Sequence, residues 1–296
     1  MTMIAYVGPD LPQDLVTATG ACSGPLGWNV DRAMPAADRW LESKFPLWTR
    51  SILQDWADGA LDRMDAVIFS RADDAAQRLY YYVCELRERG EISGPEPMIF
   101  DAATIGRGSS VAHMRGAIER LAARLGVDDA ALEGGIVATN VLRDVAPEIG
   151  GDGPLCLLAG TPPPDRRLHA MIEAAGWRAA GQTLAESWQY PGDLHVDEGS
   201  GDPCAAIARQ LHGAAQGSRA FRDHAGALMA QAQDVRASAA ILWFAEEDEA
   251  RIWHLPAQRD ALAQADVPTL ILTRRDWRAN DGAGEEIAAF LKEHTA

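Results

Sequence analysis

The residues best suited to hold an anion form a Gly-Ser stretch in the first half of the chain. Gly106, Gly108, Ser109 and Ser110 follow a short apolar run and precede a helical pattern at 111–125. Backbone N–H groups at the start of a helix can hold phosphate oxygens. The stretch lacks the third glycine of a dinucleotide-binding fingerprint and the lysine of a P-loop. It is therefore either a phosphate-binding loop or an ordinary loop that caps a helix.

A second polar group follows the apolar run 66–69 and consists of Ser70, Arg71 and Asp73. Ligands of parallel α/β sheets bind beyond the carboxyl ends of the strands, so these residues are cleft candidates. Arg71 could pair bidentately with a phosphate or a carboxylate of a ligand. Asp73 could instead only cap the helix expected at 73–89. Both alternatives stay open.

An acidic run at 246–249 follows the apolar run 239–244. Hard cations prefer carboxylate oxygens, but runs of charge more often lie on a solvated surface. Glu246 and Glu247 are candidates for an acid, a base or a partner contact, and Asp276 is a further cleft candidate.

The remaining polar and aromatic residues point to no familiar catalytic motif. The seven histidines show no metal-binding H-x-x-x-H or H-E-x-x-H spacing, and we expect no metal site. Ser23 and Ser187 lie in no Gly-x-Ser-x-Gly elbow, which argues against an α/β-hydrolase. Trp188 could line an acyl pocket or pack in an aromatic core.

Composition narrows the class of protein. The 296 residues carry 27 basic and 43 acidic side chains, a formal net charge of −16, which argues against binding to nucleic acid or anionic membranes. No apolar run approaches the roughly 18 residues of a membrane span. No signal peptide is visible. The four cysteines are far apart and form no C-x-x-C pair, which indicates reduced thiols in the cytoplasm.

The elements that must position these residues alternate between short apolar runs and amphipathic stretches. Strands are expected at 4–7, 66–69, 97–100, 155–159, 239–244 and 269–272. Helices are expected at 11–16, 73–89, 111–125, 166–175, 202–212, 221–237, 256–264 and 284–293. Continuous rather than alternating apolar runs indicate parallel strands covered on both faces. A Gly/Pro/acid stretch at 144–154 indicates a linker. The sequence thus predicts an α/β protein of two consecutive doubly wound lobes, 1–148 and 149–296.

Several segments, taken in order, resemble the 2-hydroxyacyl-CoA dehydratase and benzoyl-CoA reductase family. The resemblance covers nearly the whole chain and rests on the order of the segments, because no single segment is specific. The segments are 12–20, 64–73 with 78–82, 157–162 with 172–176, 202–209, and 267–272 with 289–291.

This resemblance implies a pair of flavodoxin-like (Rossmann-type) lobes, a heterodimer and a CoA thioester ligand. In the family each subunit normally holds a [4Fe–4S] cluster through three cysteines. An ATP-dependent activator supplies one electron, a ketyl radical forms and the β-hydroxyl leaves. Thiolates are the soft donors that such a cluster needs.

The chain departs from the family at the three expected cysteines. The resemblance places Phe45, Ala72 and Ala245 at these positions, and the actual cysteines, Cys22, Cys84, Cys156 and Cys204, lie elsewhere. The prediction is therefore a cluster-free subunit that shapes an acyl-CoA cleft beside a cluster-bearing paralogous subunit. One alternative is a stand-alone ligand-binding or regulatory pseudoenzyme on the same fold. Another is an unusual cluster that uses Cys22 with non-cysteine ligands.

Overall fold

The computed structural model describes residues 3–103, 105, 107–145, 149–215 and 222–295. The chain divides into two compact units. One unit contains residues up to 146 together with 188–221, and the other contains 147–187 together with 222–296. The predicted boundary after residue 148 lies outside the described residues. The sequence prediction did not include the return of segment 188–221 to the first unit.

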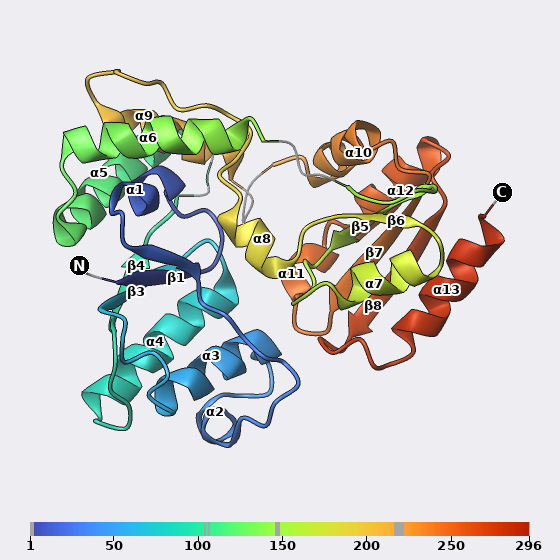
Figure 1. Ribbon diagram of the computed structural model, residues 1–296, viewed down its shortest axis with the longest axis horizontal. Helices are drawn as coiled ribbons and strands as arrows, with labels where there is room; N and C mark the ends of the chain where they lie inside the picture. Colours follow the sequence, from blue (N-terminus) through green and yellow to red (C-terminus); the bar gives the residue numbers. More distant parts are fainter. Residues whose placement is uncertain (1–2, 104, 106, 146–148, 216–221, 296) are drawn as a thin grey trace. The chain divides into compact units, whose positions relative to one another are not determined.

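The first unit is built on a parallel sheet of four strands. Its strands are β1 (Ile4–Val7), β2 (Cys22–Pro25), β3 (Ala66–Ser70) and β4 (Glu96–Phe100), in the order β2-β1-β3-β4. β1 and β3 are buried along their whole length, as expected for strands that are covered on both faces. Figure 1 shows helices on both sides of this sheet.

Eight helices accompany these strands among the described residues. They are α1 (Gln13–Ala18), α2 (Pro35–Trp40), α3 (Leu47–Ala57), α4 (Asp74–Glu88), α5 (Gly108–Leu125), α6 (Asp129–Arg143), α9 (Pro203–Ala214) and α8 (Leu184–Gln189), in which the chain passes between the units. Local sequence fixes several of their ends. The Asp73 side chain accepts a hydrogen bond from the Ala76 amide and caps α4, and Gly126 ends α5 in the left-handed conformation.

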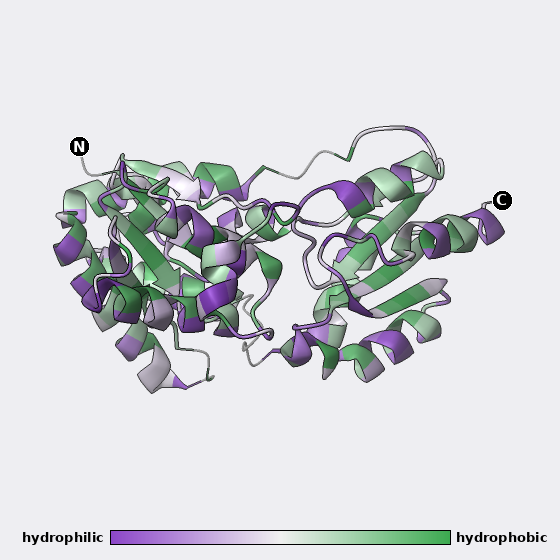
Figure 2. Cartoon of the chain, turned by 90° about the horizontal axis from the view of Figure 1, so that it is seen from below, coloured by the Kyte–Doolittle hydropathy of each residue, from purple (hydrophilic) through white to green (hydrophobic). Residues whose placement is uncertain are grey.

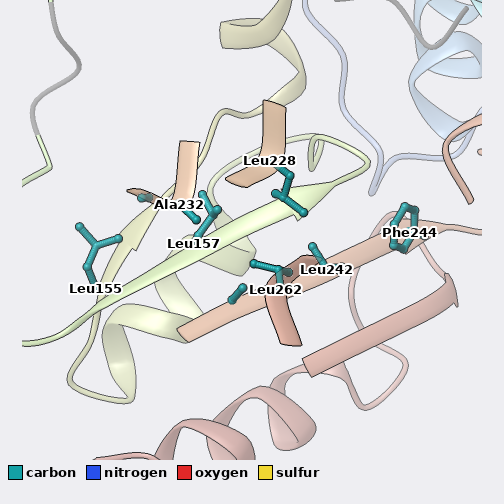
Figure 3. Packing of buried hydrophobic residues seen from close by; sticks show 9 residues of the cluster. Leu155, Leu157, Leu228, Ala232, Leu242, Phe244 and Leu262 are labelled. Carbon is teal, nitrogen blue, oxygen red and sulfur yellow. The ribbon is translucent and has the colours of Figure 1, made fainter. Parts of the chain in front are cut away.

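The second unit repeats the plan with its own parallel sheet. The strands β5 (Leu155–Gly160), β6 (Arg178–Ala180), β7 (Ala239–Ala245) and β8 (Thr269–Arg275) lie in the order β6-β5-β7-β8. Its helices are α7 (Arg167–Ala174), α10 (His224–Asp234), α11 (Glu249–Ile252), α12 (Leu255–Gln264) and α13 (Ala283–Glu293). Leucine side chains from β5, β7, α10 and α12 pack with Phe244 in one core (Figure 3). Figure 2 shows the strands of both units as mostly hydrophobic and the hydrophilic stretches on helices and loops.

The two sheets share one connection pattern. In each, the second strand lies on one side of the first and the third strand on the other, with the fourth beyond it. The chain therefore changes direction across the sheet between the first and third strands, β1 and β3 in one unit and β5 and β7 in the other. Open α/β sheets bind ligands at this point, beyond the carboxyl ends of the strands.

A buried ion pair holds segment 188–221 in the first unit. Arg143 of α6 and Asp14 of α1 form two hydrogen bonds of 2.8 Å each, and both side chains are 1% exposed. Arg143 also donates to the Pro191 carbonyl oxygen, at 3.3 Å. Asn140, one turn earlier, donates to the Val196 carbonyl oxygen and accepts from the Val196 amide. The loop after α8 is therefore tied to α6 through polar groups.

Comparison with the sequence shows where the prediction was incomplete. All six predicted strands are present, and so are the predicted helices, with ends shifted by a few residues. The prediction for 111–125 was wrong about the start of the helix, because α5 begins at Gly108 and includes Ser109 and Ser110 in its first turn. The predicted helix start at 221 lies outside the described residues. The elements that the sequence did not reveal are β2, β6, α2, α3, α6, α8 and α11.

Among the described residues, no helix is both long and apolar enough to cross a membrane.

Candidate functional site

The carboxyl edge of the first sheet holds the predicted residues Ser70, Arg71 and Asp73, which lie at or just after the end of β3. Ser70 is fully buried, and its hydroxyl oxygen accepts a hydrogen bond from the Ala72 amide at 3.0 Å. Asp73 caps α4. Both side chains therefore have structural partners, and of the three, Arg71 has the side chain most open to a ligand.

Arg71 belongs to a cluster that the sequence reasoning missed. Its guanidinium lies 2.9 Å from one carboxylate oxygen of Asp101, which follows β4. The Nε2 atom of His113 on α5 lies 3.1 Å from the other oxygen. Asp101 follows the predicted strand 97–100 directly, so its place at a strand end was a usable signal. His113 could not be found in this way, because it lies within helix α5 and does not follow a strand.

The predicted phosphate-binding loop lies beside this cluster in the sequence. Gly106 is outside the described residues, and Gly108, Ser109 and Ser110 form the first turn of α5. The preceding residue, Arg107, makes no side-chain capping hydrogen bond to the helix. Ser109 is exposed and Ser110 is buried. Phosphate binding at this turn stays a prediction.

Two of the three positions where the family resemblance expects a cluster cysteine lie in the first unit and hold buried apolar side chains. Phe45 is buried, with its ring centroid 5.2 Å from that of Tyr82 and 4.1 Å from the Arg78 guanidinium carbon. Ala72 is fully buried after β3. In the second unit, Ala245 at the end of β7 is 3% exposed. None of these side chains can ligate iron, so the residues at these positions do not fit a cluster.

Three of the four cysteines, Cys22, Cys156 and Cys204, are also poor ligands. Burial raises the pKa of the Cys156 thiol to about 12, and burial with nearby acidic groups raises that of Cys204 to about 11. Burial raises the pKa of Cys22 as well, although the Gly24 amide donates a hydrogen bond to its sulfur. Metals bind the thiolate form, which these shifts disfavour. Within the described ranges, no group of three or more His, Cys, Asp or Glu side chains could hold a metal ion.

Three other candidates, Ser23, Ser187 and Trp188, also have structural partners. The Ser23 hydroxyl donates to the Ile4 carbonyl oxygen, and the Ser187 hydroxyl donates to that of Leu184. Trp188 is buried, with its ring centroid 5.1 Å from that of Trp28 and 5.0 Å from that of Trp48. This arrangement favours the aromatic core over an acyl pocket for Trp188.

The carboxyl edge of the second sheet places Glu246, Glu247 and Asp276 after β7 and β8. Exposed Glu246 pairs with Arg274 at 3.3 Å, and Asp276 accepts a hydrogen bond from the Arg278 amide. Glu247 is half-buried and accepts a 2.8 Å hydrogen bond from the Trp277 indole. Burial raises the pKa of the Glu247 carboxyl. The fold therefore favours the protonated form of the Glu247 carboxyl.

A neighbouring network, also missed by the sequence reasoning, joins the ends of β5 and β7. The Thr161 hydroxyl donates to Asp248 at 2.7 Å and accepts from the Ala245 amide. Asp248 also pairs with Arg251 of α11 at 3.1 Å. These bonds fix the loop that carries Glu247.

Glu247 yields a prediction about pH. Its raised pKa means that the unfolded chain releases this proton at lower pH than the folded chain, so Glu247 costs stability as pH rises above about 4.3. We expect Glu247→Gln to unfold at higher temperature than the wild type at pH 7. The difference should shrink as pH falls toward 4.5, in melting curves recorded at several pH values. Glu246→Gln is the control, because that residue is exposed. A pH-independent difference would contradict the prediction.

No model of a known protein family matches the chain, and no curated protein matches its sequence. The resemblance to the dehydratase and reductase family therefore stays a prediction.

Proposed function

We propose that this chain is a cluster-free subunit of a 2-hydroxyacyl-CoA dehydratase or benzoyl-CoA reductase type complex. It would help to shape an acyl-CoA cleft while a paralogous subunit carries the [4Fe–4S] cluster and an ATP-dependent activator supplies electrons. The main support for this proposal is that the three positions where the resemblance expects cysteines hold apolar residues. These residues are Phe45, Ala72 and Ala245.

The strand order supports the proposal. Both sheets follow the order 2-1-3-4 when their strands are numbered within each unit, which is the start of the flavodoxin-like order 2-1-3-4-5. Two flavodoxin-like lobes are what the resemblance implies. The free cysteines suit the reducing cytoplasm in which we place the complex.

Complex formation tests the proposal directly. The chain is co-expressed with a tagged paralogue that has all three cysteines, and the two are purified together without oxygen. We expect a stable complex whose iron and brown colour belong to the paralogue, with this chain colourless alone. If the chain binds none of these paralogues, the proposal is overturned. If that chain instead showed a thermal shift with CoA thioesters, the stand-alone binding protein would replace it.

A further inference from the structure

Helix α6 has two faces of different character. Leu132, Ile136 and Thr139 are buried on the side that packs against α1. The opposite side is exposed and apolar. Its side chains include Val137, 48% exposed, and Val141, 62% exposed.

We define the α6 outward face by the exposed residues on this side. They are Gly134, Val137, Ala138, Val141 and Leu142. Leu142 is 57% exposed, and Val145, which follows the end of the helix, is 66% exposed. From Gly134 to Leu142 the sequence contains no charged residue. Contiguous exposed apolar surface of this kind marks interaction sites on soluble proteins.

The spacing on this face suits a helical partner. Gly134, Val137 and Val141 follow one another at intervals of three and four residues. Intervals of three and four keep apolar residues on one seam of a helix, where a second helix can pack. Gly134 and Ala138 are small, so a partner backbone can approach closely there.

The rim of the α6 outward face is acidic. Asp128 and Asp129 lie at the start of α6, and Asp144 lies at its end with 70% of its side chain exposed.

The loop 193–199 runs along one flank of the same helix. The Gly199 amide donates to Glu133 at 3.0 Å, and His195 lies 2.8 Å from Asp144. This loop adds the exposed residues Asp193 and Glu198 to the rim. Asp197 and Arg209 pair with each other at 3.4 Å and offset each other's charge, and Arg143 is buried against Asp14. The rim therefore complements a basic surface.

This charge pattern selects among the possible occupants. A second copy of the chain would bring the same acidic rim and a net charge of −16 against the first. An anionic membrane would be repelled for the same reason. We propose that the α6 outward face docks a different chain, the cluster-bearing paralogous subunit, through an apolar helix flanked by Lys and Arg. This inference rests on the proposed function, from which it takes the partner.

The test measures the dissociation constant between this chain and the tagged three-cysteine paralogue. Val141→Asp places a charge in the centre of the α6 outward face, and we expect it to weaken binding at least about tenfold. Asp144→Lys removes rim charge at a helix C-terminus, where lysine suits the helix, and should weaken binding and reduce its dependence on salt. The control is Tyr81→Asp, an exposed apolar position on α4 of the same unit. Melting curves establish that all three variants fold.

The outcomes separate this inference from the proposed function. Binding that is lost with Val141→Asp and kept with Tyr81→Asp supports docking on α6. Tight binding by all variants overturns the inference and leaves the proposed function standing. If the wild type binds no paralogue, both fall. Two further measurements test the other possible occupants. Sedimentation of the chain alone detects a dimer, and flotation with phosphatidylserine vesicles detects membrane binding. A dimer or vesicle binding that Val141→Asp abolishes would assign the face to that occupant instead.

Discussion

Removing one partner of the Asp14–Arg143 pair should lower the free energy of unfolding of the first unit by about 3–5 kcal/mol. Both side chains are 1% exposed, so Asp14→Ala would leave a buried guanidinium without its carboxylate. Arg143→Met would leave a buried carboxylate and would also remove hydrogen bonds to Asn140 and Pro191. Urea unfolding of the full-length variants, followed by tryptophan fluorescence, measures the loss.

The double variant Asp14→Leu, Arg143→Met distinguishes a buried pair from a sum of packing defects. Apolar replacement of both partners removes the uncompensated charge, so the double variant should be more stable than either single variant. An exposed pair on α4, Glu85 and Arg89, provides the control, and Glu85→Ala should cost less than about 0.5 kcal/mol. A loss below 1 kcal/mol in Asp14→Ala would show that the guanidinium finds water or another acceptor.

The same variants report on segment 188–221. Arg143 and Asn140 hold the loop after α8 through Pro191 and Val196. In Arg143→Met, limited proteolysis should cut within residues 190–202 faster than in the wild type. Glu85→Ala should leave this cleavage unchanged.

The sequence predicted those strands in which consecutive residues are all apolar and buried. The runs 66–69 and 239–244 are continuous and apolar, and β3 and β7 are buried along their length. Strand β2 was missed because Cys22–Pro25 contains serine, glycine and proline and lies partly exposed at the edge of the sheet. β2 is a strand because its backbone pairs with β1, although its own side chains show no strand pattern.

Long-range contacts explain what the sequence did not reveal about the units and the site. Asp14 and Arg143 are 129 residues apart, and no local pattern indicates that they meet and anchor 188–221. Arg71, Asp101 and His113 come together only because β3 and β4 end, and α5 begins, at one edge of the sheet. Asp73 shows the opposite case, since its role as a helix cap is local and was one of the two alternatives that the sequence left open.

A methyl group at Gly135 should be one of the most damaging single changes in the first unit. An ideal Cβ there would overlap the carbonyl oxygen of Asp14 and lie 2.8 Å from the Cβ atom of Ala18, both on α1. Backbone cannot move aside as a flexible side chain can, so α6 must separate from α1. We expect Gly135→Ala to cost about 3 kcal/mol, which for a unit of this size lowers the melting temperature by roughly 6–12 °C.

Gly134 provides a matched control one residue earlier in the same helix. An ideal Cβ at Gly134 has no atom within 4 Å, so Gly134→Ala gains helix propensity without a clash. We expect this control to stabilise the chain by about 0.5–1 kcal/mol. Both substitutions add the same methyl group to one helix. Their effects on the free energy of unfolding are opposite because Gly135 faces α1 and Gly134 faces open space. Equal melting temperatures for the two variants would mean that α6 does not pack closely on α1, which would also remove the geometric basis for the α6 outward face.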